Sequence, residues 1–150
     1  MIKLSLPASE MRAFRKWTER TTAEERVKLQ NLVARSGELI TRSSKIAAPV
    51  SKKVGAGGRL RSSISPAYSS DRLTYNVEVN VNYAPFMEFG TGKFVRILPG
   101  YADIAVQFRG SGIRKVNLKS HPFLYDNFER VNKAFLKELN KMGFHERSVR

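Results

Sequence analysis

Residues 73–82 constrain the fold most, because apolar and polar side chains alternate along them without a break. Successive side chains of a β-strand point to opposite faces, so this pattern predicts a strand with one buried face and one solvated face. Residues 60–68 supply an antiparallel partner, joined to the first strand by residues 69–72. The apolar positions of the alternating strand are Leu73, Tyr75, Val77, Val79 and Val81.

A second hairpin is predicted further along the chain. Apolar residues alternate over 104–108 and again over 116–118, and the glycines at 110 and 112 supply a turn between them. The segment 94–103 contains Pro99 and Gly100 and is predicted to be irregular. Residues 60–119 are therefore predicted to form an antiparallel sheet of about four strands with basic loops.

Two helices are predicted to flank this sheet. Thr22 and Glu25 have the spacing of a capping box, and the pattern that follows predicts a long helix over 21–48, ended by Pro49. Over 122–143, apolar residues recur at steps of three and four, which predicts an amphipathic helix that ends at Gly143. The fold class is therefore a single α+β domain, residues 1–150, with the sheet packed by both helices.

Residues 1–20 carry a shorter helical pattern. Ser9 can cap its start, and Met11, Phe14 and Trp17 are three apart, so they form one apolar edge. Two interpretations remain open for this segment: a helix docked on the chain's own core, or an arm docked on a neighbouring subunit.

Charge is the strongest global feature, since 27 Lys and Arg against 13 Asp and Glu give a net charge of +14. Such an excess predicts attraction to polyanions or acidic partners. A solvated basic surface that aids solubility is an equally open interpretation. The basic residues expected to contact DNA or an acidic partner are Lys52, Lys53, Arg59, Arg61, Lys93, Arg96, Arg114 and Lys115.

Several classes of protein gain no support from the sequence. There is no cysteine, hence no disulfide framework or thiolate zinc site, and no apolar run approaches the ~20 residues of a membrane span. The glycine-rich loop 55–58 lacks the Gly-Lys-Ser/Thr that enters a helix in a phosphate-binding loop. We expect a soluble protein made in the cytoplasm that is not an enzyme, with no catalytic, cofactor-binding or metal-binding residues.

The stretch 83–92 follows the alternating strand and is predicted to form a compact aromatic turn. It combines three aromatic residues with Gly90 and Gly92, which permit backbone angles closed to other residues. Glu88 is the one acid between Asn80 and Ala102. We expect it to pair with a nearby base or to accept backbone hydrogen bonds, and its loss to impair assembly more than folding.

Three pieces of the sequence together resemble a known family. They are Ala-Pro-Val at 48–50 with Gly-Arg-Leu-Arg-Ser-Ser-Ile at 58–64, Tyr-Ala at 83–84 with Glu-Phe-Gly-Thr at 88–91, and His-Pro-Phe-Leu at 121–124. In order and setting they resemble the tail-completion or head–tail joining (neck) proteins of long-tailed double-stranded DNA bacteriophages. The likeness covers roughly residues 20–143 and departs at 51–57, a longer loop than the family has.

The resemblance implies a structural virion protein. It implies a ring of six in the viral neck, between the head closure or portal-side connector and the tail terminator or tail tube, with double-stranded DNA passing through its lumen. A closed ring needs a heterologous interface, and aromatic anchors suit one. The expected subunit or partner contacts are Trp17, Tyr83, Phe86, Glu88, Phe89, Gly90, Thr91, Pro122 and Phe123.

A small basic nucleic-acid-binding protein is the alternative function. The net charge favours it, whereas the sequence carries no helix-turn-helix, zinc-finger or RNA-recognition signature. An enzyme is the third class. It gains no support, because His121 and His145 are the only histidines and no paired carboxylates or nucleophile motif accompany them.

Overall fold

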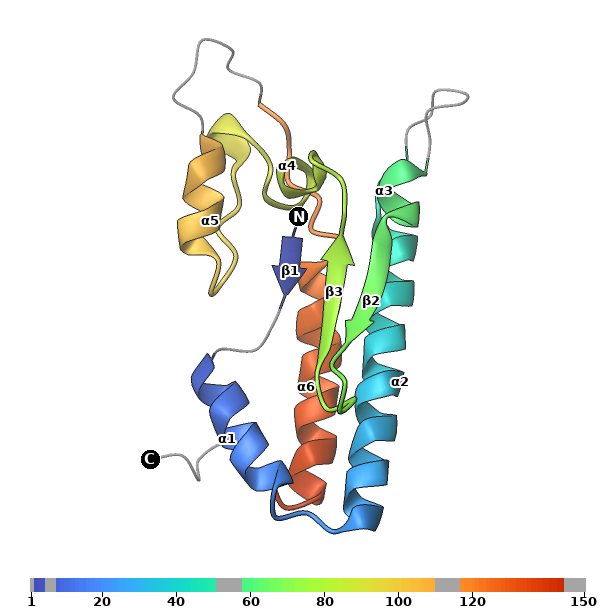
Figure 1. Cartoon of the computed structure of the whole chain (residues 1–150). Coiled ribbons are helices and arrows are strands. Elements are labelled where there is room, and N and C mark those ends of the chain that lie inside the picture. Colours follow the sequence, from blue (N-terminus) through green and yellow to red (C-terminus); the bar gives the residue numbers. More distant parts are fainter. Residues whose placement is uncertain (1, 5–7, 51–57, 110–116, 145–150) are drawn as a thin grey trace.

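The computed structural model of the chain describes residues 2–4, 8–50, 58–109 and 117–144 (Figure 1). Its elements are, in chain order, β1 (Ile2–Leu4), α1 (Ala8–Thr18), α2 (Ala23–Ala47), α3 (Arg59–Ser62), β2 (Ile64–Tyr68), β3 (Tyr75–Val79), α4 (Ala84–Phe89), η1 (Gly92–Phe94), α5 (Ala102–Val106), η2 (Gln107–Arg109) and α6 (Tyr125–Lys141). The described residues therefore form an α+β fold, as the sequence predicts.

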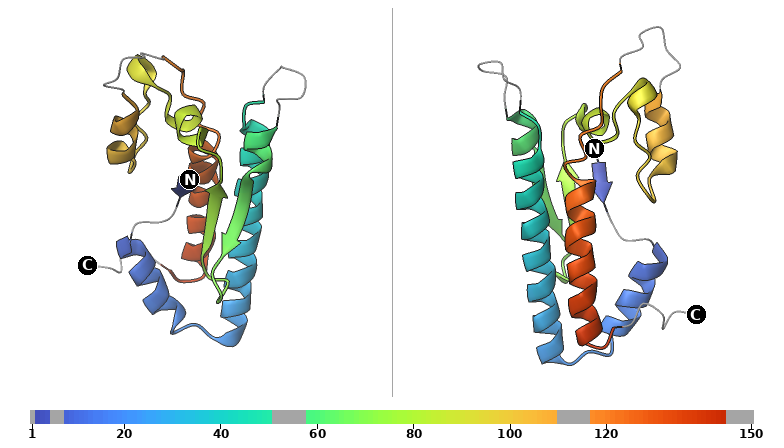
Figure 2. Two further views of the ribbon diagram at one scale, coloured as in Figure 1. Left: turned by 45° about the horizontal axis from the view of Figure 1, so that its top comes forward. Right: turned by 180° about the vertical axis from the view of Figure 1, so that it is seen from behind.

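The sheet is antiparallel with the strand order β1-β3-β2. The central strand β3 pairs through Val79 with Ile64 of β2 and with Ile2 of β1. Val77 and Val79 are buried, whereas Asn76 before them and Glu78 between them are only half-buried, so the predicted alternation is confirmed, over a strand shorter than the predicted 73–82. Helices α2 and α6 run side by side and antiparallel, and both cover one face of the sheet (Figure 2).

The long helix α2 starts and ends where its sequence signals predict. Thr22 Oγ1 accepts the backbone N–H of Glu25, and a Glu25 carboxylate oxygen accepts the N–H of Thr22, which together make the predicted capping box. The helix ends at Ala47, two residues before Pro49. Midway along it, the ring of Tyr75 lies against Gly37, and its hydroxyl bonds to the Gly37 carbonyl. A side chain at Gly37 would displace that ring, so the glycine lets β3 approach α2 closely.

Helix α1 docks on the chain's own core. Phe14 is buried, and the rings of Phe14 and Trp17 lie 5.9 and 5.4 Å from that of Phe144, at the end of α6. Leu29, Val33, Leu73 and Leu139 complete this cluster of buried side chains. Of the two interpretations of the N-terminal segment, the structure shows the first.

The predicted second hairpin is wrong, and so is the count of about four strands. Residues 102–106 form helix α5, residues 107–109 form η2, and residues 117 and 118 are not in a strand. Only Ala105 of α5 is buried, against Phe89, Leu98 and Tyr125. The apolar residues at 104 and 106 therefore alternate by coincidence, because Ala105 between them is the one that packs inward. Gly110–Val116 lie outside the described residues.

Two further differences concern strand limits. Residues 59–62 form the short helix α3, so β2 begins at Ile64 rather than at Leu60. Conversely, the sheet gains the strand β1 near the N-terminus, which no sequence pattern predicted. A strand of three residues is too short to show an alternation.

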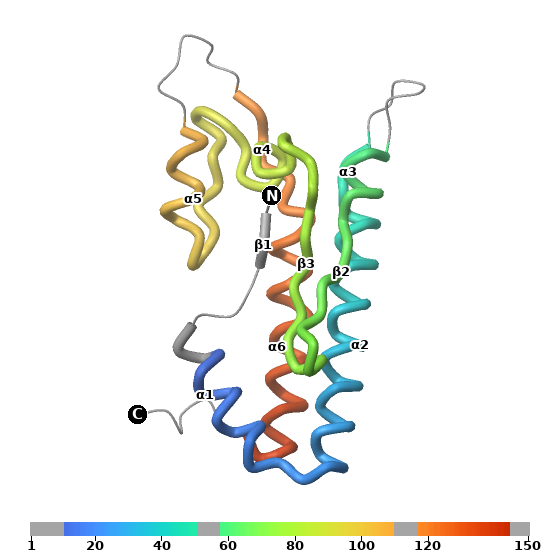
Figure 3. Tube along the Cα trace, viewed as in Figure 1, coloured from blue at the N-terminus to red at the C-terminus, as the bar shows by residue number. Residues whose placement is uncertain are grey.

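Residues 84–109 form a small lobe at the end of the molecule opposite α1 (Figure 3). We call this segment, α4 through η2, the α4–α5 lobe. The sequence predicted a turn at its start, whereas residues 84–89 form a helix, with Pro85 in its first turn, where proline is well tolerated. Phe89, Leu98 and Ala105 make its core, together with Tyr125 of α6.

Candidate functional site

The carboxylate of Glu88 joins the α4–α5 lobe to the start of α6. One of its oxygens accepts the backbone N–H groups of Phe123 and Leu124 at 3.0 and 3.1 Å, and the other accepts that of Tyr125 at 2.7 Å. The first N–H groups of a helix have no partner within the helix, so Glu88 supplies acceptors at the start of α6. Glu88 as a whole is only 1% exposed. The predicted backbone hydrogen bonds are confirmed, and Glu88 forms no salt bridge with a described residue.

Burial and hydrogen bonding act on Glu88 in opposite directions. Burial disfavours the charged form and is the larger effect, whereas the three N–H donors favour it. The negative charge of Asp126 adds a smaller upward effect. The net result raises the pKa of Glu88 from 4.5 to about 7. The junction therefore holds a carboxyl group that titrates near neutral pH.

Backbone contacts extend the same junction along the segment before α6. The Ser120 hydroxyl donates to the Glu88 carbonyl at 2.6 Å, and the N–H of His121 donates to the Met87 carbonyl at 2.7 Å. Two hydrogen bonds join Thr91 and Leu118. The Thr91 N–H donates to the Leu118 carbonyl, and the Leu118 N–H donates to the Thr91 hydroxyl. The lobe is thus held to residues 118–125 by a continuous set of hydrogen bonds.

Gly90 lies at the end of α4, where residues 118–120 of the segment before α6 pass close to it. Its φ is +77°, a conformation that favours glycine. A Cβ there would lie 2.7 Å from the Phe94 carbonyl oxygen and 2.8 Å from the Leu118 carbonyl oxygen. Backbone atoms cannot give way as a flexible side chain can. Gly90 is therefore required both for its conformation and for the close approach of two other segments.

The sequence pieces that carry the family resemblance meet in one core cluster. Ala48, Leu60 and Ile64 come from the first piece, Ala84 from the second, and Phe123 with Leu124 from the third. All of these side chains are buried and pack with Val77, Val79 and Val81 of the β3 region. Segments separated by up to 76 positions in the chain thus form a single structural unit.

The predicted interface residues fall into two groups. Glu88, Phe89, Gly90 and Phe123 are buried within the chain itself, so they have no side-chain surface to offer a partner. Their burial leads us to expect that losing Glu88 impairs folding first, contrary to the sequence-based expectation. Thr91, Pro122 and Trp17 are half-buried, and Trp17 lies on α1, away from the lobe. Tyr83 and Phe86 are exposed.

Tyr83 and Phe86 belong to a larger set of exposed apolar side chains on and beside the lobe. The set, which we call the lobe surface, comprises Tyr83, Phe86, Phe94, Ile97, Ile104 and Val106. The Phe86 ring meets that of Phe108 edge to face at 5.1 Å, and Phe108 stacks on buried Phe89 at 5.6 Å, so aromatic contacts lead from the surface into the lobe core. Contiguous exposed apolar patches mark sites of protein contact, so these side chains are the ones to test for such a role.

Sequence reasoning missed the residues of this set beyond 86. Phe94 and Ile97 lie in a segment predicted to be irregular, and Ile104 and Val106 were assigned to a strand of the second hairpin. The available signal was the density of large apolar residues beside Pro99 and Gly100, where no regular pattern could bury them all.

The predicted basic contact residues are scattered. Arg59 and Arg61 are exposed on α3, at one end of α2. Lys93 and Arg96 are exposed in the lobe, where the Lys93 ammonium lies 5.1 Å from the Phe94 ring centre and Arg96 pairs with Asp126 at 3.4 Å. Lys52, Lys53, Arg114 and Lys115 lie outside the described residues.

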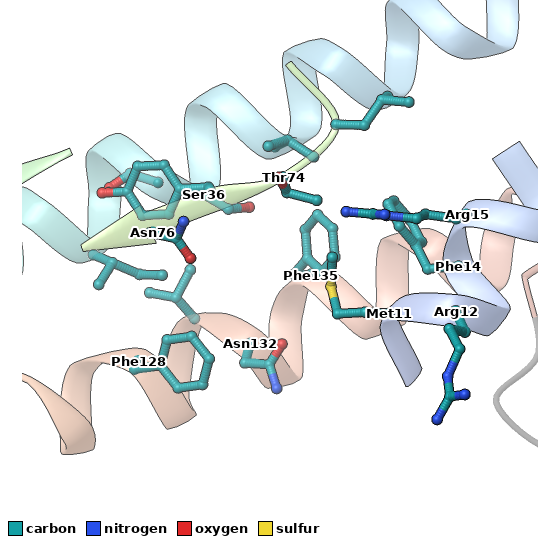
Figure 4. A pocket seen from close by; sticks show the side chains of 16 residues that line it. Met11, Arg12, Phe14, Arg15, Ser36, Thr74, Asn76, Phe128, Asn132 and Phe135 are labelled. Carbon is teal, nitrogen blue, oxygen red and sulfur yellow. The ribbon is translucent and has the colours of Figure 1, made fainter. Parts of the chain in front are cut away.

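A cavity of about 650 Å³ opens between α1, α2, β3 and α6 (Figure 4). Phe14, Phe128 and Phe135 contribute apolar walls, and the Arg15 side chain reaches toward the cavity from α1. Among the described lining residues, the titratable groups are arginines and Tyr75, whose pKa burial raises to about 12. The described lining includes no histidine, cysteine, aspartate, glutamate or lysine side chain.

The described part of the chain contains no group of three or more histidine, cysteine, aspartate or glutamate residues placed to hold a metal ion. It also has no helix that combines the length and the apolar character needed to span a membrane. No protein-family model, no curated protein and no solved structure matches the chain.

Proposed function

We propose that this protein is a structural component of the neck of a long-tailed bacteriophage. In this proposal, six copies form a ring in the virion between the head closure or portal-side connector and the tail terminator or tail tube. The ring joins the DNA-filled head to the tail, and double-stranded DNA passes through its lumen. The protein is made in the cytoplasm of the host bacterium and acts without a cofactor.

The meeting of the family-like pieces in one core cluster is the observation that carries this proposal. Ala48, Leu60, Ala84 and Phe123, which come from all three pieces, share one core, as pieces of one structural unit should. Glu88 strengthens the argument, because it belongs to the most specific of the pieces and its partners Phe123 and Leu124 belong to another. Such pieces act as one unit that holds the lobe in place.

The lobe surface gives the proposal a means of assembly. A ring forms when one surface of a subunit meets a different surface of the next and the rotation closes. Exposed apolar and aromatic side chains such as Phe86, Phe94 and Ile97 are suited to the core of such an interface. The hydrogen bonds of Glu88 fix the lobe to the helical body, so a contact made by the lobe positions the whole subunit.

Electron microscopy of a lysate from a phage or prophage that lacks this gene tests the proposal. The expected result is full heads and finished tails lying unattached, with joined virions restored when the wild-type gene is supplied from a plasmid. Intact virions in the deletion lysate would overturn the proposal.

The net charge of +14 favours one alternative, a small basic nucleic-acid-binding protein. Under that alternative, the purified protein binds DNA duplexes with an affinity that falls steeply as salt rises, because bound counterions are released. Intact virions together with strong, salt-sensitive DNA binding would favour it over the neck proposal.

A further inference from the structure

A groove of about 340 Å³ runs between α2 and the neighbouring α3–β2 segment. One wall is a single face of α2, since its residues 38, 41, 42, 45 and 46 recur at helical spacing. The opposite wall is made by Arg61 of α3 and Pro66 of β2. We call this feature the α2–β2 groove. Its α2 residues, 38–46, belong to the half of α2 that is remote from α1 (Figure 1).

The groove combines basic and apolar groups. Arg42, Lys45 and Arg61 line it with one carboxylate, that of Glu38. None of the three cations forms an ion pair with a described residue, and they outnumber the one carboxylate in the groove. Ile46 lines the same groove and is 71% exposed, the highest fraction among the exposed large apolar side chains of the described chain.

We propose that the α2–β2 groove binds an acidic segment of a partner protein, with an apolar side chain of that segment covering Ile46. Charge complementarity is the first argument, because three cations against one carboxylate attract a segment rich in aspartate and glutamate. Ile46 and Pro66 are the second argument, since an apolar side chain from the partner would remove both from water.

The same features disfavour two other occupants. A DNA backbone offers phosphates to the cations but no apolar group to cover Ile46. A second copy of this chain, with 27 basic against 13 acidic residues, complements a basic groove less well than an acidic segment does. The inference does not depend on the neck proposal, because peptide binding is measured on the purified protein without any phage.

Fluorescence anisotropy with three fluorescein-labelled probes tests the inference on the full-length protein. The probes are a short peptide that alternates glutamate with leucine, a matched peptide with serine in place of each leucine, and a DNA duplex. We expect the glutamate–leucine peptide to bind about tenfold more tightly than the glutamate–serine peptide, since only the former covers Ile46. Arg61→Glu is expected to weaken both peptides about fivefold or more.

Two further variants make the result specific to the groove. Ile46→Ser is expected to abolish the preference for leucine over serine while leaving the weaker peptide unaffected. Lys133→Glu changes the net charge by the same amount as Arg61→Glu at an exposed site on α6, outside the groove, and is expected to change binding less than twofold. All three positions are exposed, so thermal melting should verify that each variant remains folded.

Three outcomes would overturn the inference. The first is equal binding of the two peptides by the wild-type protein. The second is an effect of Lys133→Glu as large as that of Arg61→Glu, which would show attraction to net charge alone. The third is tighter binding of the DNA duplex with the same sensitivity to Arg61→Glu, which would assign the groove to nucleic acid.

Discussion

The Glu88 carboxylate accepts the backbone N–H of Tyr125 at 2.7 Å, across 37 positions of the chain. Because the same carboxylate also bonds to Phe123 and Leu124, one side chain of α4 serves the whole entry to α6. The lobe and the helical body are therefore linked by a buried acid rather than by apolar packing alone. Because hydrogen bonds are directional, these bonds fix both the position and the orientation of the lobe on the helical body. A surface used in assembly needs both to be fixed.

Glu88→Ala should lower the free energy of unfolding by about 3 kcal/mol or more, because it leaves three buried N–H groups without an acceptor. Chemical denaturation followed by circular dichroism measures this. The matched control is Asp126→Ala, which removes an exposed acid from the first turn of α6 and should cost less than about 1 kcal/mol. Equal effects of the two variants would contradict the proposed role of Glu88.

The pH dependence of stability should carry a signature of Glu88. Its pKa rises from 4.5 to about 7 on folding, so between these values the folded state binds more protons than the unfolded state. Stability from this group is thus complete below about pH 4.5 and is lost as pH rises through about 7, by roughly 3 kcal/mol in total.

Denaturant unfolding of the wild type and of Glu88→Gln at several pH values between 4.5 and 8 measures this contribution. A glutamine does not titrate. The unfolding free energy of the wild type should therefore fall relative to that of Glu88→Gln as pH rises and the Glu88 carboxyl ionises. A difference that stays constant over this range would show that the pKa of Glu88 is not raised.

Part of this fold follows from local sequence patterns. The alternation that buries one face of β3, the capping box that starts α2 and the apolar repeat that buries one face of α6 were each predicted correctly, although β3 spans only Tyr75–Val79 of the predicted 73–82. Helix α5 was missed because its burial depends on Ala105, a residue that fits either a helix or a strand.

The site was predictable only in part, for a related reason. That Glu88 accepts backbone hydrogen bonds could be expected from an isolated acid in an aromatic segment. Its three donors could not be identified, since they lie 35 to 37 positions away and no local pattern connects them. Likewise, the exposure of Phe94 and Ile97 depends on how the lobe packs. No helical or strand periodicity in the sequence indicates which of its apolar side chains are left exposed.

Gly90→Ala should destabilise the protein by about 3 kcal/mol, because strain at positive φ adds to the clash with the Phe94 and Leu118 carbonyls. Gly100→Ala is the matched control. Its φ is +79°, but nothing lies within 4 Å of its Cβ position, so only the strain of about 1 kcal/mol remains. Thermal or chemical unfolding of both variants separates crowding from strain, and equal losses would show that the close approach at Gly90 is unimportant.

Under the neck proposal, the double variant Phe94→Ser with Ile97→Ser should block head–tail joining without unfolding the subunit. Both side chains are exposed in the isolated chain, so the change in unfolding free energy should stay within about 1 kcal/mol. In an assembled ring, by contrast, the loss of two large apolar contacts from one interface should cost several kcal/mol per subunit.

The test is to supply this variant from a plasmid to the phage that lacks the gene, and to count joined virions by electron microscopy. Val27→Ser is the control, because Val27 is an even more exposed apolar residue in the first turns of α2, away from the lobe surface. We expect at least a tenfold loss of joined virions with the lobe variant and wild-type numbers with the control. If the lobe variant joins heads to tails as well as the wild type does, the lobe surface is not the assembly contact, and the exposed apolar residues on α2 become the next to test.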